Sequence, residues 1–216
     1  GGSDIALEMV AGAGPKVRPG KIAGGLSFNG LSQSARVDTG FSTVSSGWTL
    51  CMWLRLHAHN KGSHARSYIA DNRIAGTGSF YWLMDVGIMT FNTGSGETSF
   101  AHTPNFGVWD HYCIRSTEGE PATAFYLNGA LVQSASGVAT LGGPLTIGSY
   151  ASQYGAAGSG QYGINYFMDG DLDSLFLYHG DLPAGQIASV AQRSVISTSS
   201  WRSSPYVDTY EGFQAY

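Results

Sequence analysis

Short runs of β-branched and aromatic residues, separated by Gly, Asn, Pro and Ser, recur along the whole chain. The clearest runs are residues 47–56, 79–86, 108–116, 123–128 and 171–178. Repeated short runs without long segments at a helical period are typical of an antiparallel sandwich or barrel. The 216 residues suit one large domain of this class, since sandwiches of roughly 200 residues or more often form a single domain.

Two local signals predict a turn and a helix. Asn128-Gly129 lies between two apolar runs and is the strongest hairpin signal in the sequence, because both residues accept a positive φ. The sequence predicts a helix only over residues 184–193, with Pro183 at the start and Asp181 as the candidate cap.

The two ends of the chain differ from its middle. Residues 1–20 predict an N-terminal arm, with a short strand over residues 5–10 followed by a Gly/Pro-rich connector. Residues 194–216 are rich in Ser, Thr and Tyr and have no period, which is typical of an arm or linker. We therefore expect the folded domain to span residues 21–193.

The chain carries unusually little charge. Charged residues make up 12% of it, against roughly 25% in average domains, hydrophobic residues make up 43%, and the net charge is -4. This composition excludes disorder, a helical bundle and phosphate-based nucleic-acid binding. The longest apolar run, residues 80–84, is far short of the ~20 residues that cross a bilayer, so we expect no membrane insertion. No secretory signal is visible at Gly1-Gly2-Ser3.

Seven motifs follow one another along residues 22–193. They are GLSFNG (25–30), WTLCMWLR (48–55), WDHY (109–112), FYLNG (125–129), LTIG (145–148), FMDGDLDSLFLY (167–178) and LPAGQI (182–187). Their order resembles that of laminin-G-like, concanavalin A-type jelly rolls, including the pentraxins. The resemblance implies an all-β, two-sheet antiparallel jelly-roll sandwich with one short C-terminal helix. In such a fold the sheets pack about 10 Å apart and binding loops gather at one rim.

The resemblance also implies roles for two cysteines and one aspartate. In the pentraxin branch, the strands that match residues 48–56 and 110–116 carry a disulfide, so Cys51 and Cys113 are expected within disulfide reach. Two facing thiols in a reducing compartment are the alternative. Asp173 matches the first aspartate of the family's last motif, where the carboxylate fixes backbone N–H groups of a neighbouring loop.

Three carboxylates, Asp169, Asp171 and Asp173, alternate along one predicted strand and so share one face. A glycosidase would need two carboxyl groups at a defined separation, but the E-x-D-x-x-E signature of the fold's glucanases is absent. A structural or loop-fixing role is therefore favoured. Calcium stays open as a cofactor, with Asp71, Asn72, Asp169 and Asp171 as weak candidate ligands; otherwise no cofactor is expected.

Histidines offer a weaker metal signal. His57, His59 and His64 lie at a strand end and in the loop after it, but Lys61 and Arg66 nearby would repel a cation. An exposed loop is the favoured interpretation. His111, in the WDHY motif, is expected to be structural.

The segment between the LTIG motif and the last strand, residues 149–168, holds the candidate ligand-binding residues. In pentraxins this loop carries acidic calcium ligands, whereas here those positions are Ser, Tyr, Ala and Gln. Aromatic faces and amide groups suit a neutral sugar, but they equally suit a protein interface, or a loop packed on its own sandwich. Asp71-Asn72, followed by Arg73, could supplement the same rim. The candidates are Tyr150, Gln153, Tyr154, Gln161, Tyr162, Asn165 and Tyr166.

These observations favour a non-catalytic recognition module that binds a glycan or another surface ligand through rim loops. The first alternative is a structural assembly module, such as a capsid decoration or tail-fibre domain of a phage or other virion. Its loops and C-terminal arm would contact other subunits or a second copy of the chain. A polysaccharide-acting enzyme ranks third. Both leading hypotheses place the chain outside cells or on a virion surface.

Overall fold

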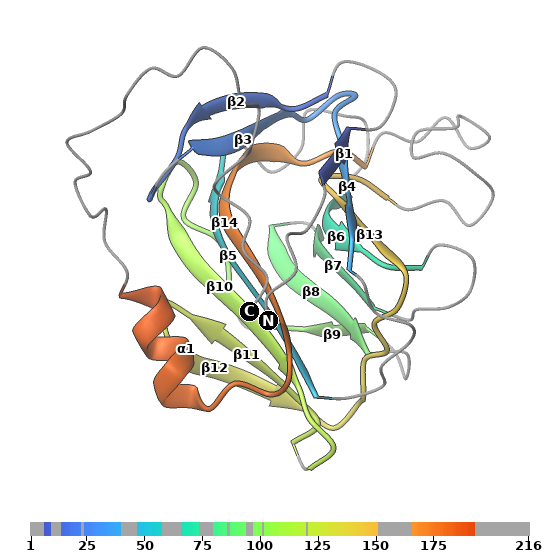
Figure 1. The fold of residues 1–216 in the computed structure, drawn as a ribbon, viewed down its shortest axis with the longest axis vertical. Coiled ribbons are helices and arrows are strands. Elements are labelled where there is room, and N and C mark those ends of the chain that lie inside the picture. The colour runs from blue at the N-terminus through green and yellow to red at the C-terminus, as the bar shows by residue number, and fades with distance from the viewer. Residues whose placement is uncertain are drawn as a thin grey trace.

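A computed structural model describes residues 7–9, 14–22, 24–39, 47–57, 66–73, 80–85, 87–93, 97–100, 102–119, 121–150 and 166–192. These residues form two antiparallel sheets that pack face to face, and their one helix lies on the outer side of one sheet (Figure 1). The predicted all-β sandwich with a short C-terminal helix is confirmed.

The first sheet has seven strands. In spatial order they are β1 (Leu7–Met9), β4 (Ala35–Asp38), β13 (Pro144–Ile147), β6 (Arg66–Asp71), β7 (Phe80–Asp85), β8 (Ile88–Thr93) and β9 (Glu97–Ser99). The sheet is assembled from distant parts of the chain, since β13 pairs with both β4 and β6.

The second sheet also has seven strands. In spatial order they are β12 (Ala130–Ala135), β11 (Thr123–Leu127), β10 (Asp110–Ser116), β5 (Trp48–Leu56), β14 (Asp169–His179), β3 (Gly24–Asn29) and β2 (Lys16–Pro19). The helix α1 (Ala184–Ala191) follows β14 and lies against the outer side of this sheet (Figure 1).

The core lies between the two sheets and follows the period of two expected of strands. Leu50, Met52 and Leu54 of β5 are buried in it with the side chains of the facing sheet, whereas Cys51 and Arg55 alternate with them on the outer side. Burial of each such side chain stabilises the fold by about 1.5–3 kcal/mol. Trp48, fully buried, also donates from Nε1 to the Ala139 carbonyl at 3.0 Å.

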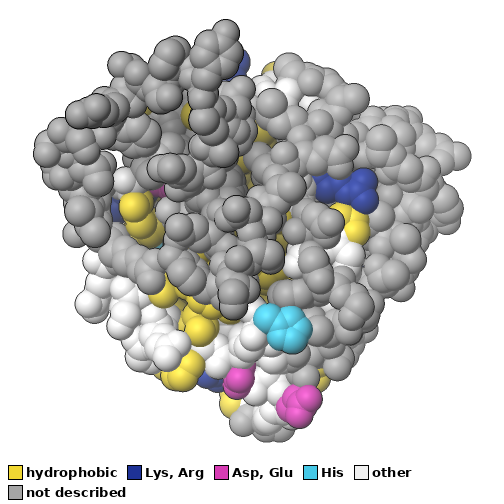
Figure 2. Space-filling view, in the orientation of Figure 1, with side chains coloured by type: hydrophobic (Ala, Val, Ile, Leu, Met, Phe, Trp, Pro, Cys, Tyr) yellow, Lys and Arg dark blue, Asp and Glu magenta, His cyan; other side chains and the backbone are white. Residues whose placement is uncertain are grey.

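The surface reflects the low charge of the sequence. On the face shown in Figure 2, few charged side chains of the described residues are visible, and hydrophobic ones gather along the middle of the view. The described helix has only 8 residues, too few to cross a bilayer.

The predicted hairpin turn is confirmed. Asn128 and Gly129 have φ values of 50° and 84° and join β11 to β12. Asn128 holds the turn in place, because its side chain accepts from the His111 N–H at 2.8 Å and donates to Asp110 at 2.8 Å. A Cβ at Gly129 would lie 2.8 Å from Ala188 Cα, so only glycine lets α1 pack this closely.

The helix is confirmed over Ala184–Ala191, and two details near the chain ends differ from expectation. The residue before the helix is Pro183, without a side-chain cap; Asp181 instead accepts from the Thr117 hydroxyl at 3.1 Å. Residues 5–10 contain the predicted strand, as β1, but Lys16–Pro19 is also a strand rather than a connector, because it pairs with β3. The N-terminal segment thus adds one edge strand to each sheet.

Candidate functional site

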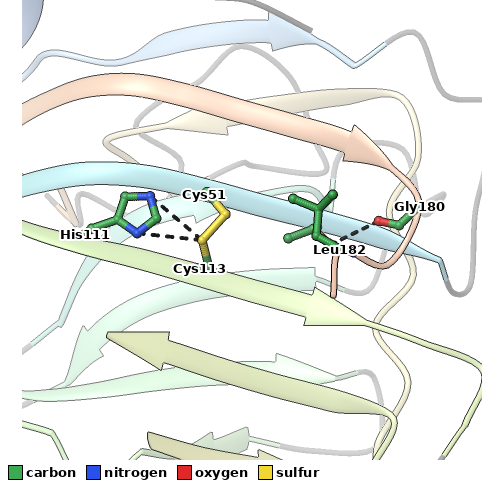
Figure 3. Close-up of a disulfide and its surroundings, with 6 residues drawn as sticks. Cys51, His111, Cys113, Gly180 and Leu182 are labelled. Atoms are coloured by element: carbon green, nitrogen blue, oxygen red, sulfur yellow. Dashed lines mark hydrogen bonds between the residues drawn. A yellow bond between two sulfur atoms is a disulfide. The ribbon is translucent and has the colours of Figure 1, made fainter. Parts of the chain in front are cut away.

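Cys51 and Cys113 form the predicted disulfide between β5 and β10, where they lie directly opposite each other (Figure 3). The bridge sits on the outer side of the second sheet, packed beneath Ile187 and Val190 of α1. Because the two cysteines are 62 positions apart, closing this loop stabilises the fold by about 4 kcal/mol on the chain-entropy model.

His111 lies beside the bridge, with both ring nitrogens 3.9 Å from Cys113 Sγ (Figure 3). Cys51, His111 and Cys113 are close enough together to resemble a metal site, but the sulfurs are joined to each other and offer no thiolate. His111 is fully buried, with its ring 5.2 Å from the ring of Trp53. Burial lowers the pKa of His111 to about 4, so the imidazole is neutral. The expected structural role is confirmed.

Asp173 has the loop-fixing role that the resemblance implied. Its Oδ2 accepts from the Ile22 backbone N–H at 2.6 Å, and its Oδ1 accepts from the Ser174 hydroxyl at 3.0 Å. The carboxylate therefore attaches the segment between β2 and β3 to β14.

The Asp171 carboxylate is hydrogen-bonded by Arg55 of β5 and contacts His57, which lies just beyond the end of β5. Its Oδ2 accepts from Arg55 Nε and Nη2 at 2.8 and 2.6 Å and lies 2.7 Å from His57 Nε2. Burial acts to raise the pKa of Asp171, but hydrogen bonds from Ser27, Arg55 and His57 outweigh it and lower the pKa. Asp171 is therefore an ionised acceptor, and not the raised-pKa acid that glycoside hydrolysis requires.

His57 lies just beyond β5 and is exposed, as expected, but its ring has two carboxylate neighbours. Besides Asp171, its ring approaches Asp169, with Nδ1 3.6 Å from Oδ1, and 37% of the side chain is exposed. His59 and His64 lie outside the described residues.

Four tyrosines gather on the outer side of the first sheet. Tyr68 of β6 is the centre, with ring centroids 5.3 Å from Tyr150, 5.5 Å from Tyr166 and 5.8 Å from Tyr81 of β7. Tyr68 and Tyr81 are buried, while Tyr150 and Tyr166 are half-buried and stack edge-to-face at 6.0 Å. We call these four residues, together with Arg73, the tyrosine cluster.

Arg73 is the cation of the cluster. Its guanidinium lies 3.9, 5.0 and 5.4 Å from the ring centroids of Tyr81, Tyr150 and Tyr68. Asp71, fully buried, holds it through bonds from Nε at 3.0 Å and Nη2 at 2.6 Å. Burial acts to lower the pKa of Arg73, but Asp71 outweighs it and raises the pKa, so the charge is permanent.

The weak metal candidates Asp71 and Asn72 therefore have other partners. Both oxygens of Asp71 accept from Arg73, so a cation would have to displace that guanidinium. Asn72 is buried and directs its amide to the backbone of Gly142 and Pro144, at 2.8 to 3.0 Å.

A polar network holds one side of the cluster. The Tyr81 hydroxyl donates to Glu97 at 2.6 Å and accepts from Asn92 at 3.1 Å. Arg66 bridges Glu97 at 3.0 Å and Asp85 at 2.9 Å. The hydrogen bond from Tyr81 and the charge of Arg66 lower the pKa of Glu97, against the effect of burial. The ring of Tyr81 is thereby held in place under Arg73.

The structure brings two of the predicted ligand-binding residues, Tyr150 and Tyr166, together with Asp71 and Arg73. Sequence reasoning missed Tyr68, Tyr81 and Glu97. Phe80 and Trp82 lie in the core between the sheets, so strand alternation places Tyr81 on the opposite, outer side. Five predicted residues lie outside the described part of the chain: Gln153, Tyr154, Gln161, Tyr162 and Asn165.

Comparison with known proteins identifies the family. A laminin-G model, described as the concanavalin A-like lectin/glucanases superfamily, matches residues 29–188. The chain is a member of this concanavalin A-like superfamily. No curated protein sequence matches the chain.

Solved structures of superfamily-like sandwiches resemble this member at low sequence identity. A heptameric SAP-like pentraxin from Limulus polyphemus is 16% identical, with a TM-score of 0.55 over 89% of this chain and 84% of the pentraxin. Domain 4 of the arabinanase AbnA from Geobacillus stearothermophilus, in complex with arabinotriose, is 16% identical, with a TM-score of 0.55 over 87% and 88%.

The binding domain of botulinum neurotoxin serotype G is 9% identical, with a TM-score of 0.60 over 87% of this chain but only 46% of the toxin domain. This superfamily member thus spans about half the length of that toxin domain. At these identities the likenesses show the fold, and they place the chain in a fold shared by several binding domains.

Proposed function

We propose that the chain is a non-catalytic recognition module that binds a glycan over the tyrosine cluster. The observation that carries the proposal is the pair of half-buried rings, Tyr150 and Tyr166, which pack together on the outer side of the first sheet, with the fixed guanidinium of Arg73 against Tyr150. Aromatic rings offer flat apolar surfaces to the C–H faces of a sugar, and their hydroxyls bond sugar hydroxyl groups.

Preorganisation supports a binding role for this cluster. The buried Tyr68 and the Asp71 carboxylate hold the two half-buried rings and Arg73 before any ligand arrives. Side chains that are already ordered lose little conformational entropy on binding, which favours affinity. The arabinanase domain of the same fold, bound to arabinotriose, supports a saccharide as the ligand class.

The carboxylate geometry supports a module without catalysis. Asp171 is ionised and held by Arg55 and His57, and Asp173 is held by the backbone at Ile22. Glycoside hydrolysis needs one carboxyl group that can donate a proton and a second that is free to act as base or nucleophile. Hydrolysis of a panel of polysaccharides, compared with an Asp171→Asn variant, tests this part: turnover lost in the variant would mean an enzyme.

The disulfide supports a location outside cells, because such bridges persist in oxidising environments. A glycan-binding module exposed on a cell or particle surface would meet its ligand there.

A glycan array tests the proposal. The double variant Tyr150→Ala/Tyr166→Ala should lose binding by about tenfold or more, since each stacked ring contributes about 1 kcal/mol or more. Tyr178→Ala is the matched control, because Tyr178 is also half-buried but lies on the second sheet. No binding to any glycan by the unaltered chain, or equal binding by the double variant, would reject the proposal.

A second candidate function is assembly with other copies or subunits, and one edge strand favours it. β12 ends the second sheet, has no charged residue, and exposes 57% of Leu131 and 38% of Val132. Uncharged apolar edges are prone to pair with another chain. Sedimentation equilibrium distinguishes the two: assembly predicts oligomers that Leu131→Lys dissociates, whereas a monomer at every concentration argues against it.

A further inference from the structure

A pocket of about 370 Å³ lies on the outer side of the second sheet, where β2, β3, β14 and β5 run side by side (Figure 1). The tyrosine cluster is on the other sheet, so the two sites are separated by the thickness of the sandwich. The volume is within the range of small-ligand sites, roughly 300–1,000 Å³.

One cross-strand row builds the pocket. Lys16 of β2 is in register with Ser27 of β3, Ser27 with Asp171 of β14, and Asp171 with Arg55 of β5. The two strands at the ends of this row, β2 and β5, are three strand spacings apart, or about 14 Å. The small Ser27 and the short Asp171 therefore form a floor between two long cationic side chains.

The floor holds an acceptor that lacks a donor. Asp171 is 3% exposed, its Oδ2 takes the hydrogen bonds from Arg55 and His57, and Ser27 also hydrogen-bonds the carboxylate. Its Oδ1 is buried and accepts no hydrogen bond within the described part of the chain. Because nearly all buried polar atoms in proteins are paired, such an oxygen at a pocket needs a partner that the described residues do not supply.

The wall on β2 holds two cationic side chains. Lys16 and Arg18 are exposed, lie two positions apart and so share one side of the strand, and have no carboxylate partner among the described residues. Three cationic side chains line the pocket against two carboxylates, on a chain with a net charge of -4. The pocket is therefore locally positive on an acidic protein, which attracts an anionic group.

An apolar surface lies beside the pocket at the end of β5. The Arg55 guanidinium stacks on Trp109, 4.9 Å from the ring centroid. The segment before Trp109 is held to β5 by a bond from Gly107 N to Leu56 O at 2.7 Å, and it exposes 42% of Phe106. An aromatic rim next to charged groups suits a ligand with both an apolar face and polar substituents.

We infer that this pocket is a second binding site, for a sugar that carries an anionic group, either a carboxylate or a sulfate. A hydroxyl of the sugar donates to Asp171 Oδ1, and the anionic group is bound by Lys16 and Arg18. A bare inorganic anion fits poorly, because it has no hydrogen to donate to the carboxylate floor. A bare cation fits poorly, because three cationic side chains line the site.

Isothermal titration calorimetry on the full chain tests the inference with soluble probes: trigalacturonate, a sulfated disaccharide, neutral galactotriose and inorganic sulfate. At least one acidic sugar should bind about tenfold or more tightly than the neutral one, and that preference should shrink as salt is added. Which acidic sugar binds decides between carboxylate and sulfate. No binding of either, equal binding of the neutral sugar, or equally tight binding of inorganic sulfate overturns the inference.

Variants locate the binding. Lys16→Ala/Arg18→Ala should weaken binding of the acidic sugar about tenfold or more, because the double variant removes both cationic donors to the anionic group. Both residues are exposed, so the fold should be retained, and an unchanged melting temperature checks this. Arg36→Ala, a cation on β4 of the first sheet, is the matched control and should bind normally. An unaffected double variant would overturn the inference.

The tyrosine cluster is tested in the same series. Tyr150→Ala/Tyr166→Ala should leave the affinity for the acidic sugar unchanged, whether or not the cluster binds a glycan of its own. Loss of acidic-sugar binding in that variant would show that this sugar binds on the first sheet. That result would overturn this inference and support the proposed function.

Discussion

At the scale of single residues, burial sets the chemistry of His111. The ring is fully buried beside Cys113 and Trp53, and its pKa in the folded protein is about 4, below the ordinary value of 6.5. The folded state thus binds a proton less readily than the unfolded state. The resulting stability is fully present above pH 6.5 and is lost as the pH falls through 6.5 towards 4.

We predict that His111 alone makes the free energy of unfolding fall by about 3 kcal/mol between pH 7 and pH 4. Urea unfolding at the two pH values measures this. His111→Gln should reduce the pH dependence by that amount, whatever its effect at pH 7. Equal pH dependence in His111→Gln and the unaltered chain would contradict a lowered pKa of His111 in the folded protein.

The pair of Asp71 and Arg73 supplies a second prediction at this scale. Asp71 is fully buried, but 29% of the Arg73 side chain is exposed, so removal of the cation should cost less than the 3–5 kcal/mol of a fully buried pair. We expect Arg73→Met to lower the free energy of unfolding by about 2 kcal/mol. Adding Asp71→Asn should recover part of this loss, since the unpaired charge is gone. A strictly additive double variant would contradict the coupling.

At the scale of elements, the contact between the β11–β12 turn and α1 depends on one glycine. Gly129 has a φ of 84°, and a Cβ there would lie 2.8 Å from Ala188 Cα. Gly129→Ala should therefore destabilise the protein by about 2 kcal/mol or more, through backbone strain and displacement of the helix.

Gly185, in the first turn of α1, is the matched control, because a Cβ there meets nothing within 4 Å. Gly185→Ala should stabilise the protein by up to about 1 kcal/mol, since alanine favours the helix. Thermal unfolding of both variants measures the difference, and a neutral Gly129→Ala would show that the helix does not rest on the turn.

Most elements could be predicted from the sequence because their signals are local. Residues 47–56 are a run rich in aromatic and other apolar residues that starts at Gly47, and they form β5 almost as expected. Lys16–Pro19 has no such pattern, since all four residues are exposed. It is a strand only because β3 offers a free edge, and a free edge is a property of the assembled sheet.

At the scale of the whole molecule, the candidate sites depend on pairs that are distant in the chain. Arg55 and Asp171 are 116 positions apart and meet because β5 and β14 are neighbours. Alternation predicts that each faces outward, but it does not say which strand is adjacent. Tyr150 and Tyr166 could be predicted from their residue type and their segment. Tyr68 and Tyr81, on which they pack, could not, because these two residues meet only when β6 pairs with β7.

The two sheets give the molecule two chemically different outer sides. The first presents aromatic rings around a paired cation, and the second presents a locally positive pocket over a carboxylate floor. A module with both sides available could bind one glycan that carries neutral and acidic sugars, or two separate ligands.

The most direct test of the central claim is an NMR titration of the isotope-labelled chain with the strongest ligand from the glycan array. We predict that the shifted resonances cluster on the outer side of the first sheet, at Tyr68, Tyr150, Tyr166 and Arg73, and that addition of EDTA does not reverse them. Shifts confined to the β12 edge, or no shifts at saturating glycan, would contradict recognition through the tyrosine cluster.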